Sequence, residues 1–150
     1  MCIRDRVTSV LTQSVARLLL APILVVAVAV LVKGYADVGD GFSAGVIAAL
    51  GILLQYLAFG RDEVVAALPV LRAPATALGG LALAVAVLAV PFALGGAPFE
   101  HWPPAGEEPV HVGSLELISA VVFDVGVFLL VLGASVTIID AFAAPEEQEA

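Results

Sequence analysis

The fold of this chain is decided at Gly34-Tyr35-Ala36-Asp37-Val38-Gly39-Asp40-Gly41-Phe42-Ser43-Ala44-Gly45, which separates two long apolar runs. Glycine and aspartate favour turns over regular structure. The flanking runs, in contrast, have the length and composition of helices that cross a membrane. The stretch therefore predicts a turn between two membrane-spanning helices, and we expect the specific function of the protein to involve this break.

The composition of the whole chain also points to a membrane protein. Of its 150 residues, 61% are hydrophobic and only 13% are charged, whereas soluble domains carry about 25% charged residues. The net charge of −8 argues against nucleic acid as a partner, because nucleic acid requires a basic face. Cys2 is the only cysteine, which excludes an intramolecular disulfide and a thiolate metal cluster.

Four stretches approach the about 20 apolar residues that a helix needs to cross the hydrocarbon core of a bilayer. We therefore predict an all-α integral membrane protein, multi-pass in the cell (inner) membrane, with one domain of four transmembrane helices. The predicted spans are residues 15–32, 41–59, 75–94 and 117–142. The segment Gly95–Ser114, which contains four prolines, is predicted to be irregular.

The basic residues predict the orientation of these spans, because cytoplasmic loops carry an excess of Lys and Arg. Arg17 lies at the start of the first span, and Arg61 and Arg72 lie between the second and third. Only Lys33 lies on the other side. We therefore expect both termini to be cytoplasmic.

The second predicted span carries a stripe of small residues at helical spacing. Small side chains let helices approach closely in lipid, and a single amide side chain can hydrogen-bond across such a contact. We interpret the stripe as a helix-packing face and not as a ligand site. It consists of Gly41, Ala44, Gly45, Ala48, Gly51 and Gln55.

Three charged residues, Lys33, Asp37 and Asp40, lie at the predicted outer boundary of the membrane. One interpretation makes the two aspartates ordinary turn residues, with Asp40 as the N-cap of the second span. The alternative is that these three charges line an ion path.

Asp124 is the most informative single residue, since it stands inside the fourth span with no polar neighbour in sequence. A carboxylate within a span is costly and by default marks an ion path or a partnered site. Because this span enters from the outside, Asp124 is expected in the same half of the membrane as Lys33 and Asp40. Two interpretations stay open: a structural ion pair, with Lys33 as one possible partner, or a carboxylate on a hydrated cation or proton route.

The fourth span has small or polar residues on two sides. Asp124 and Ser135 share one face, and Gly126, Gly133, Thr137 and Asp140 lie mostly on the other. Gly126 and Gly133 are interpreted as packing residues, and Asp140 as an interfacial residue. This pattern leaves little surface suited to lipid and suggests further helices from partner subunits.

Several other kinds of site are disfavoured. The pattern Gly39-x-Gly41-x-x-x-Gly45 lacks the βαβ context that nucleotide binding requires. His101 and His111 have no metal-ligand spacing. Since no nucleophile–base arrangement is visible either, we expect no enzyme activity, no metal and no cofactor.

Two segments together resemble the MnhB-like family of membrane proteins from multisubunit Na⁺/H⁺ antiporters (Mrp/Mnh type). The first is the opening stretch from Gly34 through Ala49, followed by Leu54-Gln55-Tyr56-Leu57-Ala58-Phe59-Gly60. The second is His111-Val112-Gly113-Ser114, followed by Phe123-Asp124-Val125-Gly126-Val127. The sequence departs from the family in having Tyr35 after Gly34 and Val38-Gly39-Asp40-Gly41-Phe42 where a proline and three glycines precede the phenylalanine.

This resemblance implies a small accessory membrane subunit that helps to complete the ion path and the assembly of a cation/H⁺ antiporter. The implied partners are the other subunits of the complex and the lipid bilayer, with Na⁺ and H⁺ as possible ions. The alternative is a structural subunit of a membrane-bound hydrogenase or another complex-I-like redox complex.

Overall fold

Four long helices form the body of the protein in a computed structural model, which describes residues 10–33, 39–68, 73–96, 110–112, 115–117 and 119–144. All four are long and apolar enough to cross a membrane. In chain order the elements are α1 (Val10–Lys33), α2 (Gly41–Phe59), α3 (Arg61–Ala67), α4 (Ala73–Ala93), β1 (Val110–Val112), β2 (Leu115–Leu117) and α5 (Ser119–Ala143).

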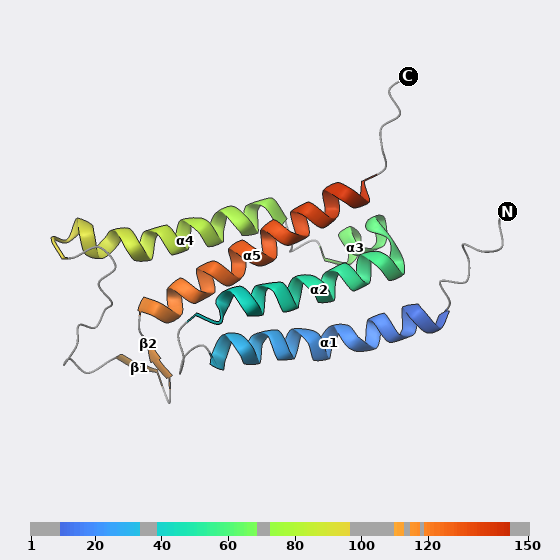
Figure 1. Cartoon of the computed structure of the whole chain (residues 1–150), viewed down its shortest axis with the longest axis horizontal. Helices are drawn as coiled ribbons and strands as arrows, with labels where there is room; N and C mark the ends of the chain where they lie inside the picture. Colours follow the sequence, from blue (N-terminus) through green and yellow to red (C-terminus); the bar gives the residue numbers. More distant parts are fainter. Residues whose placement is uncertain are drawn as a thin grey trace, which may run out of the picture.

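The long helices lie side by side in a row, in the order α1, α2, α5, α4 (Figure 1). The start of α1, the end of α2, α3, the start of α4 and the end of α5 lie together, and we call this the α3 end. The opposite end holds the end of α1, the starts of α2 and α5, the end of α4 and the two strands, and we call it the β end. Gly39 and Asp40, which directly precede α2, therefore lie at the β end.

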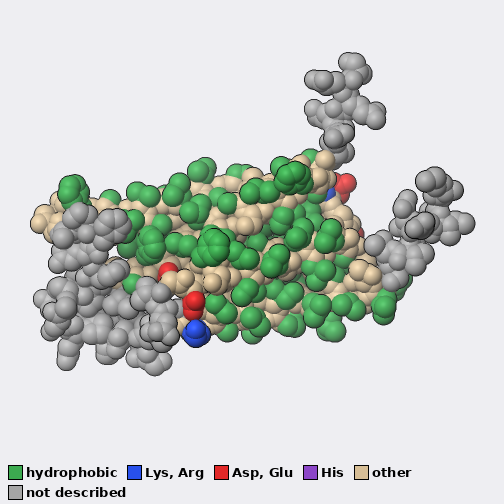
Figure 2. Space-filling model, in the orientation of Figure 1, with side chains coloured by type: hydrophobic (Ala, Val, Ile, Leu, Met, Phe, Trp, Pro, Cys, Tyr) green, Lys and Arg blue, Asp and Glu red, His purple; other side chains and the backbone are tan. Residues whose placement is uncertain are grey.

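The surface of this row suits lipid along most of its length. Side chains in the middle of the row are mainly hydrophobic, and charged side chains lie toward the ends (Figure 2). In an apolar stretch of 18 residues of each helix, half of the residues are buried within the chain for α2 and 28% for α5, against 11% for α1 and for α4. The inner helices α2 and α5 therefore form the core, and the outer helices present broad apolar faces.

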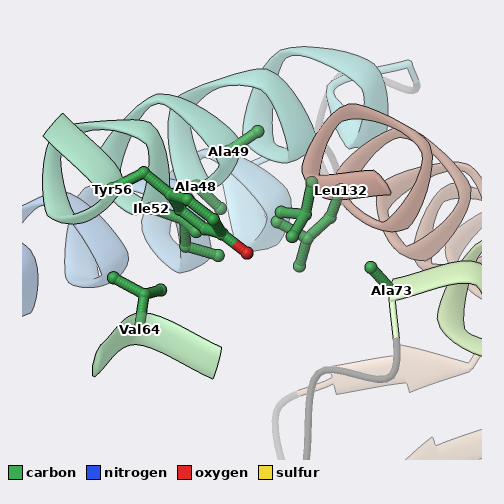
Figure 3. Close-up of a cluster of buried hydrophobic side chains, with 9 residues drawn as sticks. Ala48, Ala49, Ile52, Tyr56, Val64, Ala73 and Leu132 are labelled. Carbon is green, nitrogen blue, oxygen red and sulfur yellow. The ribbon is translucent and has the colours of Figure 1, made fainter. Parts of the chain in front are cut away.

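The core consists mainly of small side chains, because the helices approach closely. Ala44 and Ala48 of α2 are fully buried. Toward the α3 end, Ile52 and Tyr56 of α2 join Val64 of α3, Ala73 of α4 and Leu132 of α5 in one hydrophobic cluster (Figure 3). This cluster fixes α3 against the ends of the spanning helices.

A seam of close backbone contacts joins α4 to α5. Cβ atoms built at Gly126 and Gly133 of α5 would collide with backbone atoms of α4, and one built at Gly80 of α4 would collide with backbone of α5. Glycines at these positions let the two backbones touch, which is the usual way that helices associate tightly in lipid. The α4 side of this seam consists of Ala73, Ala77, Gly80 and Ala84.

The helix bounds agree closely with the sequence-based spans, with three differences. α1 begins at Val10 instead of near residue 15. A short helix, α3, which was not predicted, follows α2 after Gly60, whose φ of +83° breaks the helix.

The third difference concerns the segment Gly95–Ser114, predicted to be irregular and lying mostly outside the described residues. Val110–Val112 forms a strand that pairs antiparallel with Leu115–Leu117, with His111 opposite Glu116. Both triplets alternate apolar, polar and apolar residues, a pattern that favours strands. α5 consequently begins at Ser119 and not near residue 117.

Candidate functional site

The β end brings together three of the charged residues that the sequence singled out. Lys33 is the last residue of α1, Asp40 immediately precedes α2, and Asp124 lies in the second turn of α5. The Lys33 ammonium lies 3.6 Å from Asp40 Oδ2. Asp37, the fourth charged residue of this prediction, lies outside the described residues. The end of α1, the residues directly before α2 and the start of α5 thus share one charged site.

One interpretation of the sequence made Asp40 the N-cap of the second span, and the structure bears this out for its position but not for its side chain. Asp40 occupies the N-cap position, but its side chain makes no cap hydrogen bond, and its φ and ψ of −85° and −1° are helical. N-cap residues usually adopt β-region angles, which aim their side chain at the N–H groups of the first turn. Asp40 instead caps only through its backbone carbonyl, which accepts a hydrogen bond from the Ala44 N–H at 2.9 Å, while its carboxylate faces Lys33.

Asp124 is buried, with 5% of its surface exposed. Its Oδ2 accepts a hydrogen bond from the backbone N–H of Gly39 at 3.1 Å. The Asp124 backbone also lies directly against Gly41, where a Cβ would collide with it. Lys33, the possible partner considered from the sequence, pairs with Asp40 instead. Asp124 therefore ties Gly39, directly before α2, to α5 through a backbone donor.

The small stripe of α2 faces two different helices. Gly41 and Gly45 lie against α5, where a Cβ at Gly45 would lie 3.0 Å from the Phe128 carbonyl oxygen. Further along, a Cβ at Gly51 would lie 2.8 Å from Ile23 of α1. Gln55 Nε2 donates a hydrogen bond to the Ala16 carbonyl of α1 at 2.8 Å, and this contact is buried. Because α2 lies between α1 and α5, one stripe serves both neighbours.

The Gln55 contact leads to a modest prediction. We expect Gln55→Leu to lower the free energy of unfolding by about 0.6 kcal/mol, the average for an interhelical hydrogen bond in a membrane. Gln13→Leu is the matched control, since Gln13 donates to the Ala58 carbonyl across the same helix pair at a longer 3.3 Å. Thermal unfolding in detergent measures both changes, and a larger loss from Gln13→Leu would contradict the prediction.

The two small faces of α5 are both occupied within this chain. Asp124 faces α2 through Gly39 and Gly41, while Gly126 and Gly133 pack on α4. The sequence has small residues on both sides of α5 because α5 has a neighbour from its own chain on each side. Neighbours within the chain therefore account for both faces, and the expectation of partner subunits depends on other observations.

A second charged cluster, at the α3 end, was not predicted from the sequence. Arg61, the first residue of α3, approaches Asp140 of α5 with Nε 2.9 Å from Oδ1 and donates a hydrogen bond from Nη2 to Oδ2 at 3.0 Å. The Tyr56 hydroxyl donates to Asp140 Oδ1 at 3.2 Å. The hydrogen bond between Arg61 and Asp140, followed by the negative charge of Asp140, holds the pKa of Arg61 above its usual value.

This cluster lines a cavity of about 340 Å³ between α2, α3, α4 and α5. Four of its lining side chains are polar, namely Tyr56, Arg61, Thr137 and Asp140, and the others are mainly aliphatic. Asp140 was interpreted as an interfacial residue, and it does lie near the end of α5. Its partner Arg61 is 79 positions away in sequence, so no local pattern could have revealed the pair.

A second ion pair connects α3 to α1 at the same end. Arg17 Nη2 lies 3.3 Å from Glu63 Oε1, and the Arg17 guanidinium lies over the Phe59 ring at 4.8 Å. Both charged side chains are mostly exposed, which limits the contribution of the pair to stability. Among the described residues, no group of three His, Cys, Asp or Glu side chains could hold a metal ion.

Comparison with known proteins identifies the family. The family model described as a domain related to the MnhB subunit of Na⁺/H⁺ antiporters matches residues 11–137. The B subunit of a Na⁺/H⁺ antiporter from Bacillus subtilis is 30% identical over 142 residues, which cover 95% of this chain and 98% of that protein.

Two further matches are to longer proteins. The A/B subunit of a probable K⁺/H⁺ antiporter from Rhizobium meliloti is 34% identical over 74% of this chain, which spans only 11% of its length. In the solved structure of the Mrp complex from Dietzia sp. DQ12-45-1b, one chain matches with a TM-score of 0.72 and 26% identity. That match covers 94% of this chain and 15% of the Dietzia chain. The family resemblance seen in the sequence is thus confirmed, and the chain belongs to the family of domains related to the MnhB subunit of Na⁺/H⁺ antiporters.

Proposed function

We propose that this protein is a small membrane subunit of a multisubunit antiporter that exchanges a monovalent cation for protons. The observation that carries the proposal is the family match over residues 11–137, which extends from α1 into the last third of α5. The match to the B subunit from Bacillus subtilis supports it, since it extends over nearly the full length of both chains. The chain acts as a part of a transporter, in a multi-pass arrangement in the cell membrane.

The partners follow from the relatives of greater length. The relative from Rhizobium meliloti carries both letters, A/B, in its name, and this chain spans 11% of it. A domain that is joined to a larger protein in one relative and separate in another is expected to contact that larger protein in both. The named relatives are antiporter subunits, which favours an antiporter over a hydrogenase or another redox complex as the host.

We place both termini on the cytoplasmic side. Arg17 and Arg61 belong to the α3 end, and the first residue of α1 and the last residue of α5 lie at that same end (Figure 1). Lys33 lies at the β end. The excess of basic residues at the α3 end supports a cytoplasmic position for it, which puts Asp124 in the outer half of the membrane.

In this proposal Asp124 is the carboxylate by which the chain contributes to the cation or proton path, and Lys33 and Asp40 form the charged entrance beside it. The burial of Asp124 and its position next to an ion pair support this role. The glycines and alanines of α2, together with Gly126 and Gly133, provide the rigid helix contacts that hold the carboxylate in place.

The proposal predicts that the complex requires this chain for transport. In membrane vesicles from a host without its own antiporters, the complete complex should exchange Na⁺ or K⁺ for protons. Omission of this chain should reduce the exchange to background, and supplying it again should restore the exchange. Full exchange without the chain would contradict the proposal, and recovery of hydrogenase subunits with the purified chain would favour the redox host.

A further inference from the structure

The cavity at the α3 end is lined by side chains that could bind a cation, and it is distant from Asp124. Asp140 lies in the last turn of α5 and Asp124 in the second turn of the same helix. At a rise of about 1.5 Å per residue, these two carboxylates lie near opposite sides of the membrane. A chain that contributes to an ion path at one side therefore has a charged, cavity-lining group at the other.

Three of the side chains that line the cavity carry oxygen atoms of the kind that alkali cations prefer. Tyr56, Thr137 and Asp140 line it, and Thr137 and Asp140 share one face of α5 because they are three residues apart. The Thr137 hydroxyl donates a hydrogen bond to the Gly133 carbonyl at 2.7 Å. Its oxygen can therefore act toward the cavity only as an acceptor or a metal ligand. Carboxylate and hydroxyl oxygens are hard ligands, suited to small metal cations.

The cavity is also large enough for a hydrated ion. Its volume is about 340 Å³, whereas one water molecule needs only about 10–15 Å³ in this measure. The side chains of Arg61 and Asp140 are 36% and 32% exposed, so water reaches both. A cation can therefore approach Asp140 without losing its whole hydration shell.

Arg61 occupies the position that such a cation would take. Its guanidinium neutralises Asp140 through contacts of 2.9 and 3.0 Å. The fit is imperfect, since Arg61 Nε lies 2.9 Å from Asp140 Oδ1 without making a hydrogen bond to it. Arg61 is also attached to α3, a short helix that begins directly after Gly60. Its side chain can therefore move away while the spanning helices stay in place.

We propose that Asp140, with Tyr56 and Thr137, forms a binding site for a monovalent metal cation in this cavity, and that Arg61 is a tethered counter-cation displaced when the metal ion binds. The proposal rests on the proposed function for its physiological meaning, but the binding itself can be measured without transport. Arg61 and the cation compete for one carboxylate, so the two halves of the ion pair have opposite effects on cation affinity.

The test measures Na⁺-dependent thermal stabilisation of the purified complex at constant ionic strength, with choline as the replacement ion. A ligand that binds only the folded state raises the unfolding temperature according to its affinity. We expect Asp140→Asn to weaken the apparent Na⁺ affinity by about fivefold or more, and Arg61→Gln to strengthen it by a similar factor. Arg17→Gln is the matched control, because it removes an ion-paired arginine at the same end but outside the cavity, and it should leave the affinity unchanged.

A purely structural ion pair gives a different pattern. Both substitutions would then lower the unfolding temperature alike and leave the Na⁺ dependence unchanged, which would overturn the proposal. If the Asp140→Asn complex does not assemble, Arg61→Gln decides alone: tighter Na⁺ binding supports the site, and equal or weaker binding overturns it. If the complex binds Na⁺ in this way but exchanges no cation for protons, the proposed function fails while the site stands.

Discussion

Gly80→Leu is expected to detach α4 from α5, whereas Gly79→Leu, one residue away, is expected to be tolerated. A Cβ at Gly80 would lie 2.6 Å from the Gly126 carbonyl oxygen and closer still to the Leu130 backbone nitrogen. These are backbone atoms, so they can yield only if one helix moves away from the other. A Cβ at Gly79 meets nothing within 4 Å.

The pair of substitutions isolates helix packing from other effects. Leucine is a better helix former than glycine and equally acceptable to lipid at both positions. Overpacking typically lowers the free energy of unfolding by about 1–3 kcal/mol. We expect a loss at the upper end of this range or above it for Gly80→Leu, because the leucine side chain would meet backbone atoms in a seam of glycines and alanines. The loss should be visible as a lower unfolding temperature of the purified complex and a smaller amount of assembled protein. Equal behaviour of the two variants would show that this seam does not hold α4.

The contact between α4 and α5 could be predicted only in part from the sequence. Gly126 and Gly133 stood out in the fourth span, because glycine is conspicuous among larger residues. Their partners Ala73, Ala77 and Ala84 did not, since the third span is rich in alanine all round its surface. Nothing in that composition distinguishes the face that meets α5 from the faces that meet lipid. The helix was therefore predictable and its contact was not.

Among the charged residues, too, some features could be predicted from the sequence and others could not. Asp124 was predictable as a special residue because a carboxylate in an apolar span is expensive. Its partner was not, since the donor is the backbone N–H of Gly39, and every residue except proline has one. The Arg61–Asp140 pair depends on a short helix, α3, that places an arginine against a span far away in sequence. Such pairs are properties of the tertiary fold.

Asp124→Asn is expected to abolish most transport while leaving assembly nearly intact. The amide oxygen of asparagine can still accept the hydrogen bond from the Gly39 N–H, which Asp124 Oδ2 accepts at 3.1 Å. The side chain also keeps its volume in the tight contact with Gly41. The negative charge is the main property lost. We expect cation-dependent proton flux in vesicles to fall at least about tenfold, an increase in the barrier of about 1.4 kcal/mol.

Two further variants separate charge from anchoring. Asp124→Leu removes both the charge and the acceptor, and it should lower assembly as well as flux, because the Gly39 N–H then loses its partner at a cost of about 1–3 kcal/mol. Asp62→Asn makes the same chemical change at an exposed position of α3 and should alter neither. Normal flux in an assembled Asp124→Asn complex would exclude the charge from the ion path. Asp124 would then be only the acceptor that ties the turn before α2 to α5, and the ions would have to cross the membrane through other subunits.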